Sequence, residues 1–234
     1  WNPVGQPVPR INLSPEQQRH LGRIDTAAFA EVMDIVFASG RRSLEALRIA
    51  LATTDRLGFV ASRPLVQQAA DGVIQLLGSR RSRLSTHDAN TLQNIPRYVV
   101  AYIHAVARQN AEDPQTLERD VMDHLERCGV LSPTQIGILF AERLCLVRPE
   151  EQFFACPQCR RVHLHPSGGI CIDCLVPLNP PLPFNAAPID TDYCNFLATH
   201  GDVFRLNCEE LTGQTNKAEA RNRQRLFQGV CLPH

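Results

Sequence analysis

Apolar side chains recur at helical spacing along most of the first 146 residues, after a proline-rich opening segment, residues 1–15, that we expect to be extended. Each helix candidate starts at a capping side chain or at a proline suited to the first helical turn. Two candidates end at a glycine, which is favoured just beyond helix C-termini. The six predicted starts are Asp25, Ser43, Pro64, Pro96, Asp113-Pro114 and Ser132-Pro133, and the two glycine ends are Gly40 and Gly78. Residues 1–150 are therefore predicted to form a helical module.

The pattern changes in the last quarter of the chain. Five prolines fall within residues 177–188, so residues 179–189 are predicted to be an extended linker. Beyond it, residues 190–200 indicate a helix, VFRLNC a buried strand, and residues 217–228 a second helix after a polar turn. This order is typical of the beginning of an α/β layer, which we assign to residues 190–234. Because the chain starts at Trp1 and stops at His234 in mid-pattern, we expect it to be an excerpt of a longer polypeptide.

Two Cys-x-x-Cys pairs interrupt the helical pattern, in the stretch FFACPQCRRVHLHPSGGICIDCLVPL. Thiolates two residues apart on a tight turn can reach one tetrahedral zinc ion, and a second pair completes the site. We therefore predict a small zinc ribbon over residues 151–178 that binds one structural zinc ion and leaves no position for a catalytic water. Its four ligands are Cys156, Cys159, Cys171 and Cys174.

Other interpretations of this stretch stay open. His163 and His165 lie within the loop and are able to replace a cysteine, although two complete pairs make that unnecessary. The thiols could also be a redox pair or chemically inert. The clustered cations Arg160 and Arg161 are candidates for binding phosphates, as is the Arg-Ser run of residues 78–87. A solvated loop is the alternative for both basic clusters.

Composition and charge exclude several classes of protein. The chain has 24 basic and 24 acidic residues, so its overall charge does not attract it to nucleic acid, and any such contact must be local. No apolar run approaches the roughly 20 residues that cross a bilayer. Five of the nine cysteines lie outside the two pairs and suggest no disulfide framework. Since thiolate zinc ligands favour a reducing compartment, we expect a cytoplasmic protein without a membrane partner.

A sequence resemblance begins at FRLNCEELTGQTNKAEARNRQRLFQG near the C-terminus. This stretch resembles the second RecA-like lobe of superfamily 2 DEAD/DEAH-box helicases, in which a strand leads to an L-T-G-x-T loop and then to an arginine-bearing helix. The matching positions are Leu211 to Thr215, Arg223, Phe227 and Gly229. The chain is most similar to helicase-like proteins of bacterial anti-phage defence, of the Druantia and DISARM types. These share, in this order, an I-P-R-Y stretch (here Ile95 to Tyr98), a four-cysteine clamp, a linker and an E-E-L-T-G-Q-T segment.

The resemblance covers about residue 94 onward and implies a fold and a function. The fold is a mainly α-helical module, a four-cysteine zinc ribbon and the incomplete start of an α/β RecA-like lobe. The function is that of an ATP-dependent nucleic-acid helicase or translocase in antiviral defence, with DNA the favoured substrate and other defence-system subunits as partners. Nucleic acid would contact Thr212, Gly213, Thr215 and Arg223.

The chain also departs from that family. It contains neither the G-x-x-x-x-G-K-[ST] phosphate loop nor an acidic Asp-Glu box, so it should not hydrolyse ATP by itself. ATP and Mg²⁺ are expected only in the parent protein. EELTGQT can also be read as a solvated helix cap, in which case a non-enzymatic zinc-ribbon adaptor that binds a protein partner is the alternative function.

Overall fold

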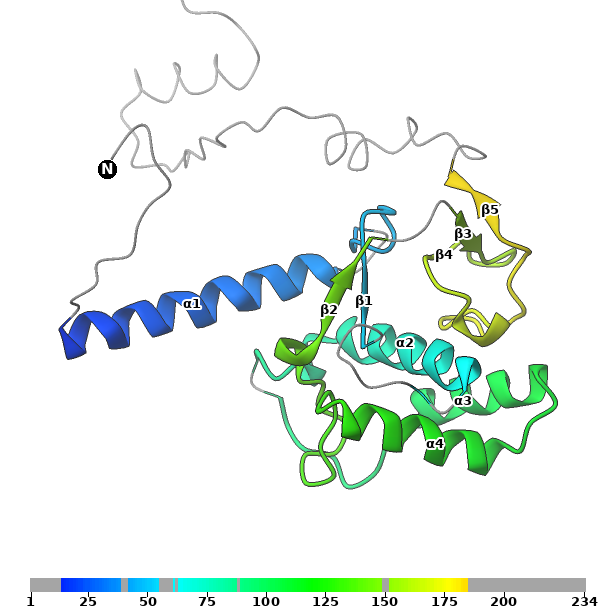
Figure 1. Ribbon diagram of the computed structural model, residues 1–234, viewed down its shortest axis with the longest axis horizontal. Coiled ribbons are helices and arrows are strands. Elements are labelled where there is room, and N and C mark those ends of the chain that lie inside the picture. Colours follow the sequence, from blue (N-terminus) through cyan, green and yellow to red (C-terminus); the bar gives the residue numbers. More distant parts are fainter. Residues whose placement is uncertain are drawn as a thin grey trace, which may run out of the picture. The chain divides into compact units, whose positions relative to one another are not determined.

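Four α-helices are the longest elements in the part of the chain that the structure, a computed structural model, describes (Figure 1). That part comprises residues 14–38, 42–54, 61, 63–87, 89–148 and 152–184. The helices are α1 (Pro15–Val36), α2 (Pro64–Gly78), α3 (Arg97–Gln109) and α4 (Pro114–Arg127). The short 3₁₀ turns are η1 (Arg81–Arg83), η2 (Ala141–Arg143) and η3 (Ser167–Gly169). All these residues belong to a compact unit that spans residues 1–198, and a second unit, residues 199–234, lies outside the described residues.

Three of the predicted helices are confirmed at their starts. α2 begins at Pro64, and Pro96 is the residue that precedes α3. Asp113 caps α4, because its carboxylate accepts a hydrogen bond from the Thr116 backbone N–H at 2.8 Å. In each case a proline or a capping side chain coincides with an apolar stripe, and the two signals together fix the start of the helix.

The first predicted helix starts earlier than the sequence indicated. α1 begins at Pro15 rather than near Asp25, because Ser14 forms a capping box with Gln17. The Ser14 hydroxyl accepts from the Gln17 N–H at 3.2 Å, and the Gln17 side chain accepts from the Ser14 N–H at 3.0 Å. Of the expected extended lead-in, Ser14 is extended and Pro15 belongs to α1, and residues 1–13 lie outside the described residues.

Two predicted helices are wrong. Ser43 does bond the Ala46 N–H at 3.1 Å, but residues 42–49 form turns, and Arg48 adopts a left-handed φ of 59°. Residues 131–137 are likewise turns, in which the Ser132 hydroxyl bonds the Thr134 hydroxyl at 2.9 Å. Serine hydroxyls stabilise turns by the same local hydrogen bonds that cap helices, so the capping signal alone was not sufficient.

The helical core is built around α2. Its side chains are buried almost all round, and it packs against both α3 and α4. A helix that is apolar on every side belongs at the centre of its layer. The fully buried core residues include Val66, Val73, Ile74, Ile103, Leu117 and Leu125. Gly72 of α2 lies against the Tyr102 hydroxyl, where a β-carbon would overlap the ring.

A short β-ladder joins the two ends of this helical region. β1 (Leu51–Thr53) pairs antiparallel with β2 (Cys145–Val147), with Ala52 opposite Leu146. The sequence pattern placed the residues of β1 in the predicted helix that starts at Ser43, which the structure does not contain. Three-residue strands carry too little alternation to be recognised against a helical background.

The predicted ribbon is a second, three-stranded sheet with the order β4-β3-β5. β3 (Gln152–Ala155) forms a hairpin with β4 (Val162–His163) and pairs on its other edge with β5 (Leu182–Pro183). β5 lies within the predicted 179–189 linker, so the described part of that segment is held to the ribbon. Ile170 and Ile172 are buried in the same apolar cluster as the helices, and the ribbon therefore shares their core.

Candidate metal centre

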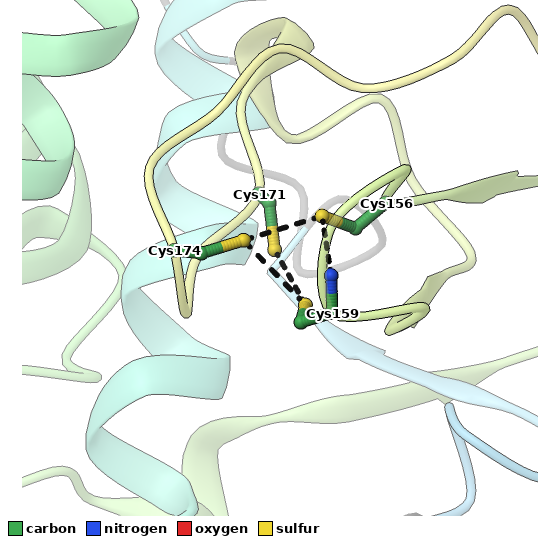
Figure 2. A group of neighbouring side chains, drawn as sticks. All are labelled: Cys156, Cys159, Cys171 and Cys174. Carbon is green, nitrogen blue, oxygen red and sulfur yellow. Dashed lines mark hydrogen bonds between the residues drawn. The ribbon is translucent and has the colours of Figure 1, made fainter.

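Four thiols meet where the two loops of the ribbon face each other (Figure 2). The Sγ atoms of Cys156 and Cys174 are 3.2 Å apart, and Cys159 Sγ lies 3.6 Å from Cys171 Sγ and 3.5 Å from Cys174 Sγ. A disulfide would bring two sulfurs to about 2.05 Å, whereas four sulfurs around one zinc ion at about 2.3 Å stand roughly 3.8 Å apart. The cluster is therefore a set of free thiols that can hold a metal ion such as zinc.

Both cysteine pairs sit on equivalent turns. In the first, the Arg160 N–H donates to the Cys156 carbonyl at 3.0 Å; in the second, the Leu175 N–H donates to the Cys171 carbonyl at the same distance. The residue after each second cysteine, Arg160 or Leu175, has a left-handed φ of 59° or 56°. This conformation turns the chain back so that both thiols of a pair point to the same side, which explains the two-residue spacing.

Backbone donors prepare one thiol for ionisation. Burial raises the pKa of Cys156, but the Cys159 N–H, 3.4 Å from its sulfur, and the neighbouring thiols outweigh burial and lower that pKa to about 7. Burial instead raises the pKa of Cys171 and of Cys174. A metal ion would supply the positive charge that allows all four to be thiolates, so metal binding would release protons.

The helical module holds the loop between the two pairs. The Tyr102 hydroxyl of α3 donates to the Ser167 carbonyl at 3.1 Å and bonds its hydroxyl at 2.9 Å. The Asn110 side chain donates to the Gly168 carbonyl at 2.9 Å. Gly168 has a φ of +59° and packs on Val106, where a β-carbon would overlap Val106 Cγ1. The metal loop is thus seated on α3 and its C-cap through a buried tyrosine, a part-buried asparagine contact and one glycine.

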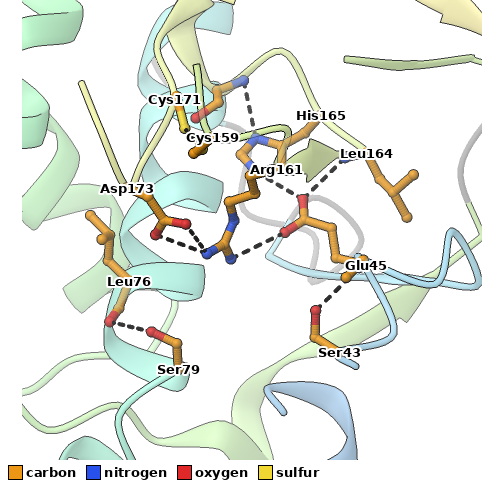
Figure 3. A network of polar contacts seen from close by, with 12 residues as sticks. Ser43, Glu45, Leu76, Ser79, Cys159, Arg161, Leu164, His165, Cys171 and Asp173 are labelled. Atoms are coloured by element: carbon orange, nitrogen blue, oxygen red, sulfur yellow. Dashed lines mark hydrogen bonds and ion pairs between the residues drawn. The ribbon is translucent and has the colours of Figure 1, made fainter. Parts of the chain in front are cut away.

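The two predicted phosphate-binding arginines of this loop differ in their surroundings. Arg160 is exposed. Arg161 is mostly buried; its Nη1 lies 2.9 Å from both carboxylate oxygens of Asp173, and its Nη2 lies 3.9 Å from Glu45 Oε2 (Figure 3). Arg161 therefore joins the two cysteine turns to the segment that precedes β1. Binding of nucleic acid by either arginine stays a prediction.

This difference gives a paired test. Arg161→Ala should lower the free energy of unfolding by about 1–3 kcal/mol, because it leaves the buried Glu45 without its cation. Arg160→Ala should change the free energy of unfolding by no more than about 0.5 kcal/mol.

If the loop lies on a nucleic-acid path, Arg160→Ala in the parent protein should also reduce the salt dependence of nucleic-acid binding by about one unit of slope. Urea unfolding of the zinc-loaded chain and a salt titration measure the two effects. Equal losses of stability would contradict the assigned roles.

The arginines of the second basic cluster also contact the protein itself. Arg80 stacks on the Tyr98 ring at 4.0 Å, and Arg81 pairs with Asp34 at 2.7 Å. Arg83 donates to the Asn90 carbonyl at 3.1 Å. These contacts fit a packing role for the cluster. The other predicted nucleic-acid residues, Thr212, Gly213, Thr215 and Arg223, lie outside the described residues.

Glu45 is the site residue that sequence reasoning missed. Its carboxylate is buried, and Oε1 accepts the Leu164 N–H of the ribbon at 3.0 Å. Burial raises its pKa to about 7, although the Arg161 guanidinium opposes that shift. A single acidic residue in an apolar run gives no sequence signal. His163 and His165 group with Glu45 and not with the cysteines, so the structure brings together the predicted all-cysteine set.

Comparison with known proteins adds no assignment to these observations. No family model, curated protein or solved structure matched the chain. Among the described helices, none combines the length and apolarity that crossing a bilayer requires.

Proposed function

We propose that this chain is the zinc-stabilised helical part of an ATP-dependent nucleic-acid helicase or translocase of bacterial antiviral defence. Zinc is structural, bound by Cys156, Cys159, Cys171 and Cys174. Four thiols fill a tetrahedral shell and leave no position for water or substrate, which argues against a catalytic role for this metal. Its role is to order a loop too short to bury a core of its own.

The observation that carries the proposal is the connection between two motifs of the resemblance. Residues Ile95 to Tyr98, the I-P-R-Y stretch, lead into α3, and Pro96 stands at its N-terminal boundary. The same helix seats the four-cysteine loop through Tyr102 and Asn110. Two motifs more than fifty residues apart in sequence thus belong to one structural unit. This packing of the I-P-R-Y stretch and the four-cysteine loop on one helix is expected if the two motifs together shape one surface of the parent enzyme.

The parent protein tests the helicase assignment through Thr212 and Thr215. Removing a hydroxyl that bonds a charged phosphate costs roughly 1–3 kcal/mol. Thr212→Val combined with Thr215→Val should therefore reduce nucleic-acid-stimulated ATP hydrolysis by roughly 5- to 150-fold and leave basal hydrolysis nearly unchanged. Steady-state ATPase assays with and without DNA measure both rates.

A matched control is Thr26→Val, which removes an exposed hydroxyl that bonds its own helix at Gly22. This variant should keep full stimulation. If the double variant also keeps it, EELTGQT is a structural cap and the helicase assignment loses its local support. A parent open reading frame without a phosphate loop and an Asp-Glu box would favour the adaptor function instead.

A further inference from the structure

A second group of metal-ligating side chains lies outside the four-thiol cluster. Glu45, His163 and His165 are 1%, 0% and 3% exposed. One ligand atom from each lies within 4.8 Å of the others. The two histidines are separated by one residue: His163 ends β4, and His165 lies in the bend that follows. Their rings stand edge to face, with an interplanar angle of 82°.

The polar atoms of this group lack the hydrogen bonds that burial demands. Glu45 Oε2, both ring nitrogens of His163, and His165 Nε2 are buried without a hydrogen-bond partner. Nearly all buried polar atoms in folded proteins are hydrogen-bonded, and groups that are not call for an unseen water or ion. Glu45 Oε2 faces Arg161 Nη2 at 3.9 Å and His165 Nε2 faces Glu45 Oε1 at 3.4 Å. Both ring nitrogens of His163 lack a partner, so the three adjoining side chains are a candidate site for a bound ion.

The remaining contacts orient these atoms toward one another. Glu45 Oε1 accepts the Leu164 N–H at 3.0 Å, whereas Oε2 lies 3.9 Å from Arg161 Nη2, beyond hydrogen-bonding distance. His165 Nδ1 accepts the Ser167 N–H at 3.1 Å, and this turns Nε2 toward the Glu45 carboxylate, 3.4 Å from Oε1. A metal ion takes the Nε2 lone pair only when the ring proton moves to Nδ1. The Ser167 hydrogen bond is then exchanged for a metal–nitrogen bond.

Local charge favours a cation at this place. Four thiolates around one zinc ion carry a formal charge of −2. Arg161 lies 2.9 Å from Asp173 and 3.9 Å from Glu45, so its single positive charge is shared between two carboxylates and does not offset both. A divalent ion beside Glu45 offsets most of that charge. Burial also lowers the pKa of His163, and lowers that of His165 to about 3, so both rings are neutral at pH 7.

We propose that Glu45, His163 and His165 form a second metal site, which binds one divalent first-row ion, zinc in the cell. Two imidazoles and one carboxylate are borderline-hard ligands that suit Zn²⁺ and Co²⁺. The ion joins the helical module, through Glu45, to the ribbon, through the two histidines. This site goes beyond the proposed function and does not depend on it, and it raises the expected zinc content from one ion per chain to two.

Cobalt substitution of the full chain distinguishes the two sites. Elemental analysis should give two metal equivalents per chain. One cobalt equivalent should show a thiolate-to-cobalt charge-transfer band, and the other should not, because its ligands contain no sulfur. His163→Gln combined with His165→Gln should lose one equivalent and keep the thiolate band. Glu45→Gln should weaken the sulfur-free site at least 10-fold. His104→Gln, which alters a histidine paired with Glu118 on the helical module, should keep both equivalents.

Two results would overturn the second site. One is a single metal equivalent in the unaltered chain, which needs no variant to fold. The other is a higher melting temperature of zinc-loaded His163→Leu relative to the unaltered chain. If the pocket is empty, leucine replaces an unsatisfied polar ring and stabilises the protein; if it holds an ion, leucine removes a ligand and lowers the melting temperature. Loss of the thiolate band alone would instead count against the four-cysteine site.

Discussion

Cys156→Ser is expected to remove the metal ion of the four-cysteine cluster and to unfold the ribbon over residues 152–184. A structural zinc ion contributes an apparent free energy of about 10–16 kcal/mol at pH 7, which is comparable to the whole stability of a typical domain, about 5–15 kcal/mol. Cys156 is the thiol whose pKa, despite burial, is lowered to about 7 by the Cys159 N–H and the neighbouring thiols, which favours its thiolate form. Elemental analysis and near-ultraviolet circular dichroism measure the loss of metal and of packing.

Cys145→Ser is the matched control, because Cys145 is a half-buried free thiol in β2 outside the metal cluster. It should retain the metal content of the unaltered chain. A Cys156→Ser protein that kept both its metal and its fold would contradict a structural four-cysteine site.

Gly168→Ala should release the metal loop from α3. A β-carbon there would overlap Val106 Cγ1 and approach Val106 Cγ2 to 3.0 Å. The left-handed φ of +59° adds about 1–2 kcal/mol for a residue with a side chain, and overpacking adds about 1–3 kcal/mol. We therefore expect the free energy of unfolding to fall by about 2–5 kcal/mol, measured by urea denaturation at a fixed free zinc concentration.

Gly169→Ala separates the two causes of that loss. Gly169 has a similar φ of +81°, but the nearest atom to its β-carbon would be Gln109 Cγ at 3.6 Å. It should therefore lose only the conformational part, about 1–2 kcal/mol. Equal effects of the two substitutions would show that contact with Val106 does not hold the loop.

The parts predicted correctly are those where local chemistry is sufficient. The four cysteines came together as expected, because tetrahedral coordination restricts the spacing of its ligands. α2 and α4 begin where a first-turn proline coincides with an apolar stripe. The RecA-like assignment of residues 190–234 stays a prediction.

The parts that were missed depend on contacts between distant residues. The ladder between β1 and β2 forms because of a partner more than ninety positions away, for which three residues carry no signal. Glu45 acquires its role only through Leu164 and Arg161 of the ribbon. The false helix at Ser43 has the same origin, because a genuine local cap is overridden when the chain turns into β1.

The ladder between β1 and β2 also sets the order in which the chain can fold during synthesis. α3 and α4 are joined by four residues, and α2 precedes them in the chain, so all three can pack once Arg127 has left the ribosome. β1 is made before all of them, yet its partner Cys145–Val147 emerges about twenty residues after α4. The chain between β1 and β2 is long, but once the three helices have packed, the ends of that chain lie closer together. Closing the loop then costs little more entropy than closing a short one. The helices therefore assemble first and the ladder second, and the metal loop, which needs α3 as its seat, is completed last.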